Sequence, residues 1–457
     1  MARYRVTVAG KNYDEMADLV RKYKLNIAGH TGKNVGGGRY VVDAFADSDQ
    51  IATLKSAGYG VDVHEDVQEA GTMRQAEVRS PAVAGAAASS SVATSNHYLN
   101  VDDVETSLAA AAAAPNTAFT KLIALPNKTW ENRDCHALKI GNGNQANRPG
   151  IFLLGGIHAR EWGSSDILIN FVEQLCDAFR TNSGITLGGA SFTAAQIQQI
   201  VNQKDIYVFP QANPDGRNHS MTAAPDWRKN RRPAPAGSHN PDCVGVDLNR
   251  NYDFLWNFTT HFAPNAPVQN STNPCDHDIY VGPAPMSEPE TKNVVWLFEN
   301  FSNVRFFIDV HSYSEDILYS WGDDDDQTKK PQMNFQNPAF DGKRGVANDT
   351  GYKEFIPAAD KTAAVNLANQ MRTAIQAVRG RNYTVMQSMS LYPTAGTSDD
   401  YAYSRHIVDS SKPKVLSYTI EWGSPNNPTP FHPPYAEMKQ IIQEITAALL
   451  QFCLRAA

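Results

Sequence analysis

The sequence predicts an α/β protein with a mixed, mostly parallel twisted sheet that carries helices on both faces, preceded by a small ferredoxin-like α+β domain. Short apolar runs indicate buried strands, and they lie at 151–154, 205–209, 304–310 and 415–420. Longer segments with helical apolar spacing separate them, at 102–114, 162–178, 361–379 and 434–453. This alternation of strands and helices is typical of a sheet covered by helices on both sides.

The first 66 residues follow a different order and predict a separate small domain. Apolar residues alternate in 4–8, as in a half-buried strand, and take helical spacing in 16–23. Gly37-Gly38 opens a strand at 40–42, a second helix follows at 51–54 and ends at Gly58, and a last strand covers 61–63. The order strand-helix-strand-strand-helix-strand is that of a ferredoxin-like domain over 1–66.

Residues 67–96 are predicted to connect the two domains as an exposed linker. Their centre, 84–91, reads Ala-Gly-Ala-Ala-Ala-Ser-Ser-Ser, which buries too little surface to order the chain. We therefore expect the linker to be open to proteases at Arg74 or Arg79. The large domain then covers 97–457.

The composition limits the classes of function. The chain has 457 residues, which is enough for one large and one small domain, and its 42% hydrophobic and 19% charged content is that of a globular protein. A net charge of −7 argues against nucleic acid as a partner, and no stretch reaches the length of a membrane span. The first residues lack the apolar core of a signal peptide.

Three residues predict a catalytic zinc site. His158 and Glu161 form a His-x-x-Glu pair just after the apolar run 151–154, and His311 follows the run 304–310. Two imidazoles and one carboxylate hold zinc and leave the fourth position for water, whereas a structural site fills it with a protein ligand. The carboxyl ends of neighbouring strands meet in the crevice where α/β sheets bind substrates, so we expect these side chains to converge there.

Five cysteines stand at 135, 176, 243, 275 and 453, so at least one is unpaired. No Cys-x-x-Cys occurs, which argues against a redox motif or a structural zinc site. Cys176 falls in a helical apolar pattern and is expected to be a core thiol. Cys243 and Cys275 flank a loop rich in Gly, Pro and Asn and could close it.

Further motifs recur along the chain in a fixed order: Asn213-Pro214-Asp215-Gly216, Trp227-Arg228-Lys229, Asp247-x-Asn249-Arg250, His311-Ser312-Tyr313, Tyr392 and Glu421. With His158-x-x-Glu161 they make residues 97–457 resemble the funnelin-type zinc carboxypeptidases, the family of carboxypeptidases A and B. The small domain resembles the inhibitory pro-domain of that family. The resemblance implies one Zn²⁺ per chain, a zymogen, and hydrolysis of the C-terminal peptide bond of peptides and proteins.

The resemblance also implies a role for each matching residue. Glu421 would act as general base towards a water whose pKa zinc lowers. Arg228 would stabilise the oxyanion of the tetrahedral intermediate. Asn249 and Arg250 would bind the terminal carboxylate of the substrate, because a guanidinium fork matches a carboxylate. Tyr392 would close over the bound end.

Two further side chains are expected to act at the edges of this site. Asp247 resembles the carboxylate that orients a ligating imidazole, here that of His158. Arg160 resembles a residue that contacts more distant parts of the substrate. The resemblance also implies a Cys243–Cys275 disulfide in an oxidising compartment. It further implies a secreted monomer that an activating protease releases by cutting the linker.

Asp399 carries the expectation about specificity. Counted from Tyr392, it occupies the position that is apolar in A-type and Asp in B-type enzymes, so the resemblance implies a preference for C-terminal Lys or Arg. A carboxylate at the base of a pocket attracts a cation and penalises an apolar side chain. The alternative is that Asp400 is the structural residue and Asp399 points elsewhere, which would leave a broad or apolar specificity.

Two departures from the animal enzymes bear on the detail. The segment 323–360 looks longer, and its Asp323–Asp326 run could repel acidic substrates, bind calcium through oxygen ligands or form a solvated loop, which is the preferred interpretation. Glu421 is followed by Trp422-Gly423-Ser424 instead of Leu-Arg-Asp. Two other functions stay open: a non-catalytic peptide-binding module, and an enzyme that is active uncut, with 1–66 as a permanent targeting domain.

Overall fold

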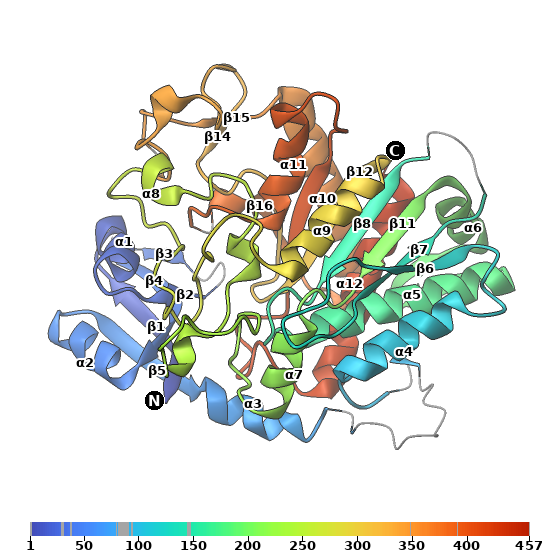
Figure 1. The fold of residues 1–457 in the computed structure, drawn as a ribbon, viewed down its shortest axis with the longest axis horizontal. Helices are drawn as coiled ribbons and strands as arrows, with labels where there is room; N and C mark the ends of the chain where they lie inside the picture. The colour runs from blue at the N-terminus through green and yellow to red at the C-terminus, as the bar shows by residue number, and fades with distance from the viewer. Residues whose placement is uncertain are drawn as a thin grey trace.

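The computed structural model describes residues 2–28, 32–36, 39–78, 80, 91–92, 95–143, 148–347, 349–390 and 392–456. Figure 1 shows the small N-terminal domain, in blue, packed against one end of a much larger domain built around a twisted sheet. The α/β class is therefore confirmed, with an antiparallel sheet in the small domain and a mixed sheet in the large one.

The small domain follows the predicted order of strands and helices except that three strands, not two, lie between its two helices. Its elements are β1 (Arg3–Gly10), α1 (Tyr13–Arg21), β2 (Asn26–Ile27), β3 (Lys33–Gly36), β4 (Arg39–Asp47), α2 (Ser48–Ser56) and β5 (Gly60–Asp66). The sheet order is β2-β4-β1-β5, all antiparallel, with β3 also paired to β4. Asp47 caps α2 by accepting from the Gln50 backbone N–H, while the Gln50 side chain accepts from that of Asp47.

Eight strands form the sheet of the large domain, in the order β16-β13-β17-β12-β8-β11-β7-β6. Five central neighbours, β11, β8, β12, β17 and β13, are parallel except for the β13–β17 pair, and the β6–β7 and β7–β11 pairs are antiparallel. The strands are β6 (Thr120–Ala124), β7 (His136–Ile140), β8 (Gly150–Gly155), β11 (Asp205–Phe209), β12 (Val304–Ser312), β13 (Asp316–Tyr319), β16 (Thr384–Gln387) and β17 (Leu416–Trp422).

Helices cover both faces of this sheet (Figure 1). Ile151 and Leu153 of β8 pack into one hydrophobic cluster, whereas Phe152 and Leu154 pack into another on the opposite face. The first cluster includes α4 (Val101–Ala112), α5 (Gly163–Thr181), α6 (Ala194–Gln203), α10 (Ala358–Arg379) and α12 (Tyr435–Arg455). The second includes α9 (Pro289–Asn300) and α11 (Ser398–Val408). A strand buried on both faces explains why its sequence is a continuous apolar run.

Shorter elements complete the large domain. They are β9 (Ile185–Leu187), β10 (Ala190–Phe192), α7 (Pro214–Thr222), α8 (Phe258–His261), β14 (Asp326–Gln327) and β15 (Glu354–Phe355), with short 3₁₀ turns at Pro241–Cys243, Leu248–Arg250, Pro338–Phe340 and Ser388–Ser390. None of the helices that the structure describes combines the length and the apolar character that a membrane crossing requires.

The segment predicted as linker begins with a helix, which corrects the expectation of unordered chain over its first part. α3 spans Val67–Gln75, and the Asp66 carboxylate caps it by accepting from the backbone N–H groups of Gln68 (2.9 Å) and Glu69 (3.1 Å). Val67, Ala70 and Gly71 are buried, so this helix has an apolar face that composition did not reveal. Arg74 lies within α3, whereas residues 79, 81–90 and 93–94 lie outside the described part.

The Asp323–Asp326 run is not the solvated loop that we expected. Asp323 and Asp324 are fully buried, and with Glu354 and Asp400 they form a group that we call the acidic cluster. Tyr352 donates to Glu354 (2.5 Å), the Gly345 N–H donates to Asp324 (2.7 Å), and burial raises the pKa of Asp323 to about 6. The segment folds back on itself, since β14 pairs with β15, and Asp323 and Asp324 are buried while Asp325 and Asp326 stay partly exposed.

Candidate active site

The ends of neighbouring strands place the predicted zinc ligands side by side. β8 ends at Gly155, and Gly156 then adopts a φ of +67°, a conformation that glycine tolerates and that directs the chain towards His158. Glu161 lies two residues before α5 begins at Gly163, and His311 lies in β12, the strand next to β8. All three side chains are buried at this edge of the sheet.

The donor atoms of these three side chains converge. Glu161 Oε1 lies 2.7 Å from His158 Nδ1, and Glu161 Oε2 lies 3.2 Å from His311 Nδ1. The two Nδ1 atoms face one another at 3.0 Å. Among the described residues, His158, Glu161 and His311 are the one group of three or more His, Cys, Asp or Glu whose ligand atoms gather closely enough to hold a metal ion. A buried pair of imidazole nitrogens that face each other beside a carboxylate fits a zinc ion.

A buried carboxylate stands behind each histidine. Asp247 Oδ1 lies 3.2 Å from His158 Nε2, as the family resemblance implied, and Asp309 Oδ2 lies 2.9 Å from His311 Nε2. Such carboxylates fix the orientation of a ligating imidazole and raise its basicity. Asp309 was missed by sequence reasoning, although its position two residues before His311 in a strand places both side chains on one face.

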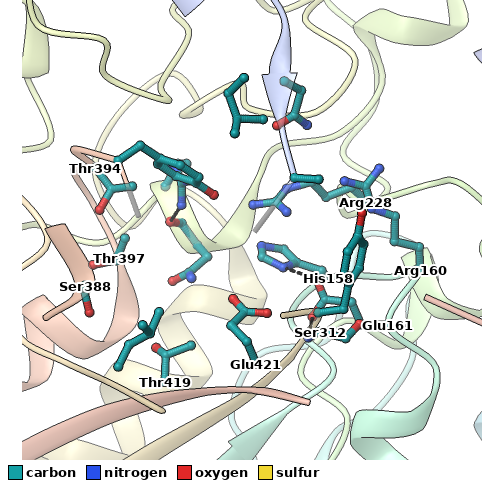
Figure 2. Close-up of a pocket in the computed structure, with 18 of the residues that line it drawn as sticks. His158, Arg160, Glu161, Arg228, Ser312, Ser388, Thr394, Thr397, Thr419 and Glu421 are labelled. Atoms are coloured by element: carbon teal, nitrogen blue, oxygen red, sulfur yellow. Dashed lines mark hydrogen bonds and ion pairs between the residues drawn. The ribbon is translucent and has the colours of Figure 1, made fainter. Parts of the chain in front are cut away.

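Glu421 faces the same space from the next strand. It is opposite His311 in the parallel register of β12 and β17, and Figure 2 shows its carboxyl group pointing towards His158 and Glu161. Burial raises the pKa of Glu421 to about 8, and the charges of Glu161 and Asp316 add to the shift while His311 opposes it. A bound cation would favour the carboxylate form and so lower this pKa. The side chain thus lies beside the three candidate metal ligands, with its carboxyl group facing them.

Arg228 lies across the cleft and is fixed by Asp247. Its Nε and Nη2 donate to Asp247 Oδ2 at 3.0 and 2.9 Å. Burial would lower the pKa of Arg228, but the Asp247 carboxylate outweighs burial and raises it above its ordinary value. Asp247 thus contacts both His158 and Arg228 and couples their positions.

Asn249 and Arg250 line the same pocket from the turn that follows Asp247. The Asn249 side-chain carbonyl accepts from the Ser398 N–H (2.8 Å), which leaves its amide nitrogen for a ligand. Arg250 donates to the backbone carbonyls of Gln269 through Nε and of Asn249 through Nη1, both at 2.7 Å. These bonds hold the guanidinium plane in place, and within the described part of the chain no hydrogen bond involves Nη2.

Asp399 and Tyr392 lie on a third side of the pocket. Asp399 is 4% exposed, and its carboxylate accepts from the side chains of Ser388 (3.1 Å) and Thr419 (3.2 Å) and from the Asp400 N–H (2.9 Å). Asp400 instead receives the Gly322 N–H at 2.9 Å. Tyr392 is half-buried and packs against the core of the small domain.

The small domain covers this pocket. Asn26, Ile27, Ala28 and Phe45 line it together with the residues of the large domain. Phe45 stacks on Phe431 with ring centroids 5.6 Å apart, and the Arg160 guanidinium lies over both rings, at 4.9 and 4.4 Å. The ends of the large-domain strands therefore form the bottom of the cleft, and the small domain, which we call the cover, closes its opening.

Ion pairs fasten the cover. Arg3 of β1 binds Asp226 (2.6 Å) and Asp278, and Arg160 binds the same two carboxylates at 2.9 and 3.1 Å. Arg5 donates to the Pro425 carbonyl across the domain boundary (3.2 Å). Arg160 thus pairs with the same two carboxylates, Asp226 and Asp278, that bind Arg3 of the small domain.

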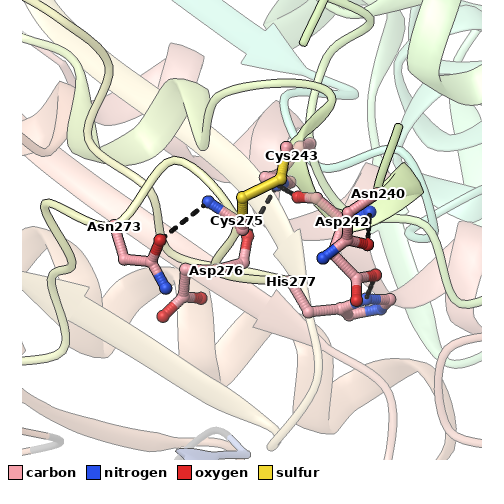
Figure 3. The surroundings of a disulfide bond; sticks show 8 residues. Asn240, Asp242, Cys243, Asn273, Cys275, Asp276 and His277 are labelled. Carbon is pink, nitrogen blue, oxygen red and sulfur yellow. Dashed lines mark hydrogen bonds and ion pairs between the residues drawn. A yellow bond between two sulfur atoms is a disulfide. The ribbon is translucent and has the colours of Figure 1, made fainter. Parts of the chain in front are cut away.

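The Cys243–Cys275 disulfide is present (Figure 3). It lies next to the segment that carries Arg228, because the residue after Arg228 contacts the neighbours of both cysteines. The buried Lys229 ammonium donates to the carbonyls of Asp242 (2.7 Å) and Asp276 (2.6 Å), the neighbours of the two cysteines. Cys135, Cys176 and Cys453 are free and buried, as expected for Cys176. The bridge therefore supports the segment next to Arg228 rather than the zinc ligands directly.

Comparison with known proteins gives a consistent result. The zinc carboxypeptidase family matches residues 106–448. Carboxypeptidase B of the crayfish Astacus astacus is 32% identical over 295 residues, which is 64% of this chain and 76% of the crayfish protein. Mouse carboxypeptidase A4 is 31% identical over 283 residues, 61% of this chain and 54% of the mouse protein, so the match spans about half the length of that relative. The crystal structure of carboxypeptidase A from Helicoverpa armigera superposes with a TM-score of 0.73 at 20% identity, covering 100% of this chain and 98% of that one.

Proposed function

Because the chain belongs to the zinc carboxypeptidase family, we propose that it is a zinc-dependent exopeptidase that removes the C-terminal residue of peptides and proteins. The observation that carries the proposal is the convergence of His158, Glu161 and His311 in a cleft that also contains Glu421, Arg228, Asn249 and Arg250. A non-catalytic peptide-binding module would not need a buried proton acceptor beside a metal site.

The residues divide the chemistry between them. Zinc, when bound by His158, Glu161 and His311, lowers the pKa of a water and polarises the scissile carbonyl. Glu421 takes the proton from the attacking water and returns it to the leaving amine, a role that suits a buried carboxylate with a raised pKa. Arg228, held by two hydrogen bonds to Asp247, stabilises the oxyanion that forms on the carbonyl oxygen.

Recognition of the chain end makes the enzyme an exopeptidase. Arg250 and Asn249 bind the terminal carboxylate, and the fixed guanidinium plane of Arg250 supports this assignment. Tyr392 closes over the bound end, and Arg160 contacts residues further from the terminus. Asp399, buried in the same pocket without a cation within 4.0 Å among the described residues, selects a C-terminal Lys or Arg.

We also propose that the chain is a zymogen. Residues 1–66 act as an inhibitory domain, 67–96 as the activation segment and 97–457 as the catalytic domain. The support is that Phe45 and its neighbours line the cleft and that Arg3 and Arg160 share Asp226 and Asp278. A protease that cuts the segment would release the cover, giving a secreted, monomeric enzyme. A permanent targeting domain would not have to occupy the cleft.

The experiment compares kcat/KM for C-terminal Arg and Phe on matched blocked dipeptides, before and after cleavage of the activation segment, with a chelator control. We expect activity that the chelator abolishes, that favours Arg and that rises on cleavage. Asp399→Ile should move the preference towards Phe, because it removes the buried carboxylate. If the wild type favours Phe, the exopeptidase proposal stands, but Asp399 does not select a basic C-terminal residue. Full activity of the intact chain would exclude the zymogen, and inactivity towards both substrates would favour the binding module.

A further inference from the structure

The acceptor sites of Asp399 are nearly all in use before any substrate binds. Oδ2 accepts two hydrogen bonds, from Ser388 Oγ and Thr419 Oγ1, and Oδ1 accepts one from the Asp400 N–H. A carboxylate oxygen has two lone-pair directions, so Oδ2 has none left and Oδ1 has one. The carboxylate therefore offers a cation one good acceptor site instead of two parallel ones.

This matters because the two basic side chains use a carboxylate differently. The guanidinium of Arg is a planar fork whose strong binding mode donates two parallel N–H groups to the two oxygens of one carboxylate. The ammonium of Lys is a compact charge with three tetrahedral donors, and it needs a single carboxylate oxygen with other acceptors around it. Each hydroxyl of Ser388 and Thr419 donates to Asp399 and keeps lone pairs that can accept from an ammonium.

We propose that Ser388 and Thr419 make the pocket selective for C-terminal lysine over C-terminal arginine, by occupying the oxygen of Asp399 that a bidentate guanidinium would need. The inference rests on the proposed function, since it assumes that the C-terminal side chain enters this pocket. Leu318, which lines the same pocket, provides an apolar wall for the methylene stem of lysine. Loss of one of two charge-assisted hydrogen bonds corresponds to about a tenfold lower kcat/KM for arginine.

The test measures kcat/KM for blocked dipeptides that end in Lys, Arg or Phe, on full-length protein cleaved in the activation segment and loaded with zinc. We expect the wild type to favour Lys over Arg about tenfold, and both over Phe. Ser388→Ala and Thr419→Val each free a lone pair on Oδ2, so each should move the Lys:Arg ratio towards one, mainly by improving Arg. Ser404→Ala is the matched control, because its buried hydroxyl on α11 donates to the Tyr401 carbonyl and not to Asp399.

The outcomes separate the inference from the function on which it rests. Equal use of Lys and Arg, with both far better than Phe, would overturn the lysine selectivity and leave the basic-specific carboxypeptidase intact. A ratio that neither hydroxyl variant moves would also overturn it. A preference for Phe would overturn the basic specificity and the inference together. Dissociation constants of free lysine and free arginine, the products, give a second readout that does not depend on turnover and should follow the same order.

Discussion

The buried carboxylates of the cleft and those of the acidic cluster face opposite electrostatic surroundings. In the cleft, Asp247 contacts Arg228 and His158, and Asp226 and Asp278 contact Arg3 and Arg160. In the acidic cluster, by contrast, Asp323 and Glu354 face one another, and Arg344 is the cation that acts on both.

The pKa values follow this difference. Burial would raise the pKa of Asp247, but Arg228 and His158 outweigh burial and lower it. Burial raises the pKa of Asp324 to about 9, and the nearby Asp323 charge adds to it. Asp247, Asp226 and Asp278, whose pKa values are lowered, therefore stay charged and hold cations, whereas the acidic cluster is stable when its carboxyl groups hold protons. Glu421, whose pKa is raised, is the exception in the cleft. Asp399 belongs to neither group, because the cation that we propose for it arrives with the substrate.

The largest effect should come from removing the proton acceptor that we propose for the cleft. Glu421→Gln keeps the size of the side chain and removes its basicity, so kcat should fall by about a thousandfold or more. The zinc ligands are untouched, so zinc content should stay at one ion per chain. The measurement pairs initial rates with metal analysis of the same sample. Turnover within about tenfold of the wild type would assign the base to another residue.

The next effect tests whether the cation pairs of the cleft also hold the cover. Arg3→Ala leaves Arg160 as the one arginine paired with Asp226 and Asp278 among the described residues, and a broken buried ion pair costs about 3 kcal/mol or more. The uncut chain should therefore gain activity, by about tenfold to a hundredfold, while the cleaved enzyme stays unchanged. Arg39→Ala, an exposed arginine of the same sheet, is the control. An uncut Arg3→Ala protein as inactive as the wild type would show that other contacts hold the cover.

A smaller effect is expected from the carboxylate behind His311. Asp309→Asn keeps a polar contact but removes the charge, so zinc affinity should fall by about tenfold to a hundredfold. At saturating zinc, kcat should recover, because Asp309 does not contact Arg228. Asp247→Asn should lower both zinc affinity and kcat, since it also releases Arg228. Competition titrations with a chromogenic chelator measure the affinity, and identical behaviour of the two variants would refute this division of roles.

Much of this arrangement follows from the sequence, because burial on both faces of the central strands leaves a strong local signal. The apolar runs at 151–154 and 304–310 became β8 and β12, and the residues just beyond or at their ends meet because the two strands are neighbours in parallel register. The Cys243–Cys275 pair was open on spacing alone and was implied only by the family resemblance. Local pattern thus predicts which residues lie at the edge of the sheet.

What the sequence did not predict depends on contacts between distant segments. α3 was expected to be unordered, since its burial comes from packing that composition does not record. Asp309 was missed because an acidic residue inside a strand has no distinctive motif. The Asp323–Asp326 run was expected to be solvated, yet its first two residues are buried, where Gly345 and Glu354, more than 20 residues further on, contact Asp324 and Asp323. The sequence of such a run gives its charge, but contacts with distant segments determine whether its side chains are exposed to solvent.

The smallest expected effect concerns the pH dependence of stability in the acidic cluster. Burial raises the pKa of Asp323 to about 6, above that of an unfolded aspartate, so the folded state binds more protons between about pH 4 and 6. Stability therefore falls as pH rises through this window and stays lower above it. Asp323→Asn replaces the shared proton with an amide donor to Glu354, and it should stabilise the protein by about 1 kcal/mol at pH 8 with little change at pH 4. Urea unfolding at both pH values measures the difference, with the exposed Asp62→Asn as control. Equal loss of stability at both pH values would mean that Asp323 stays ionised in the fold and that Arg344, not a proton, balances the cluster.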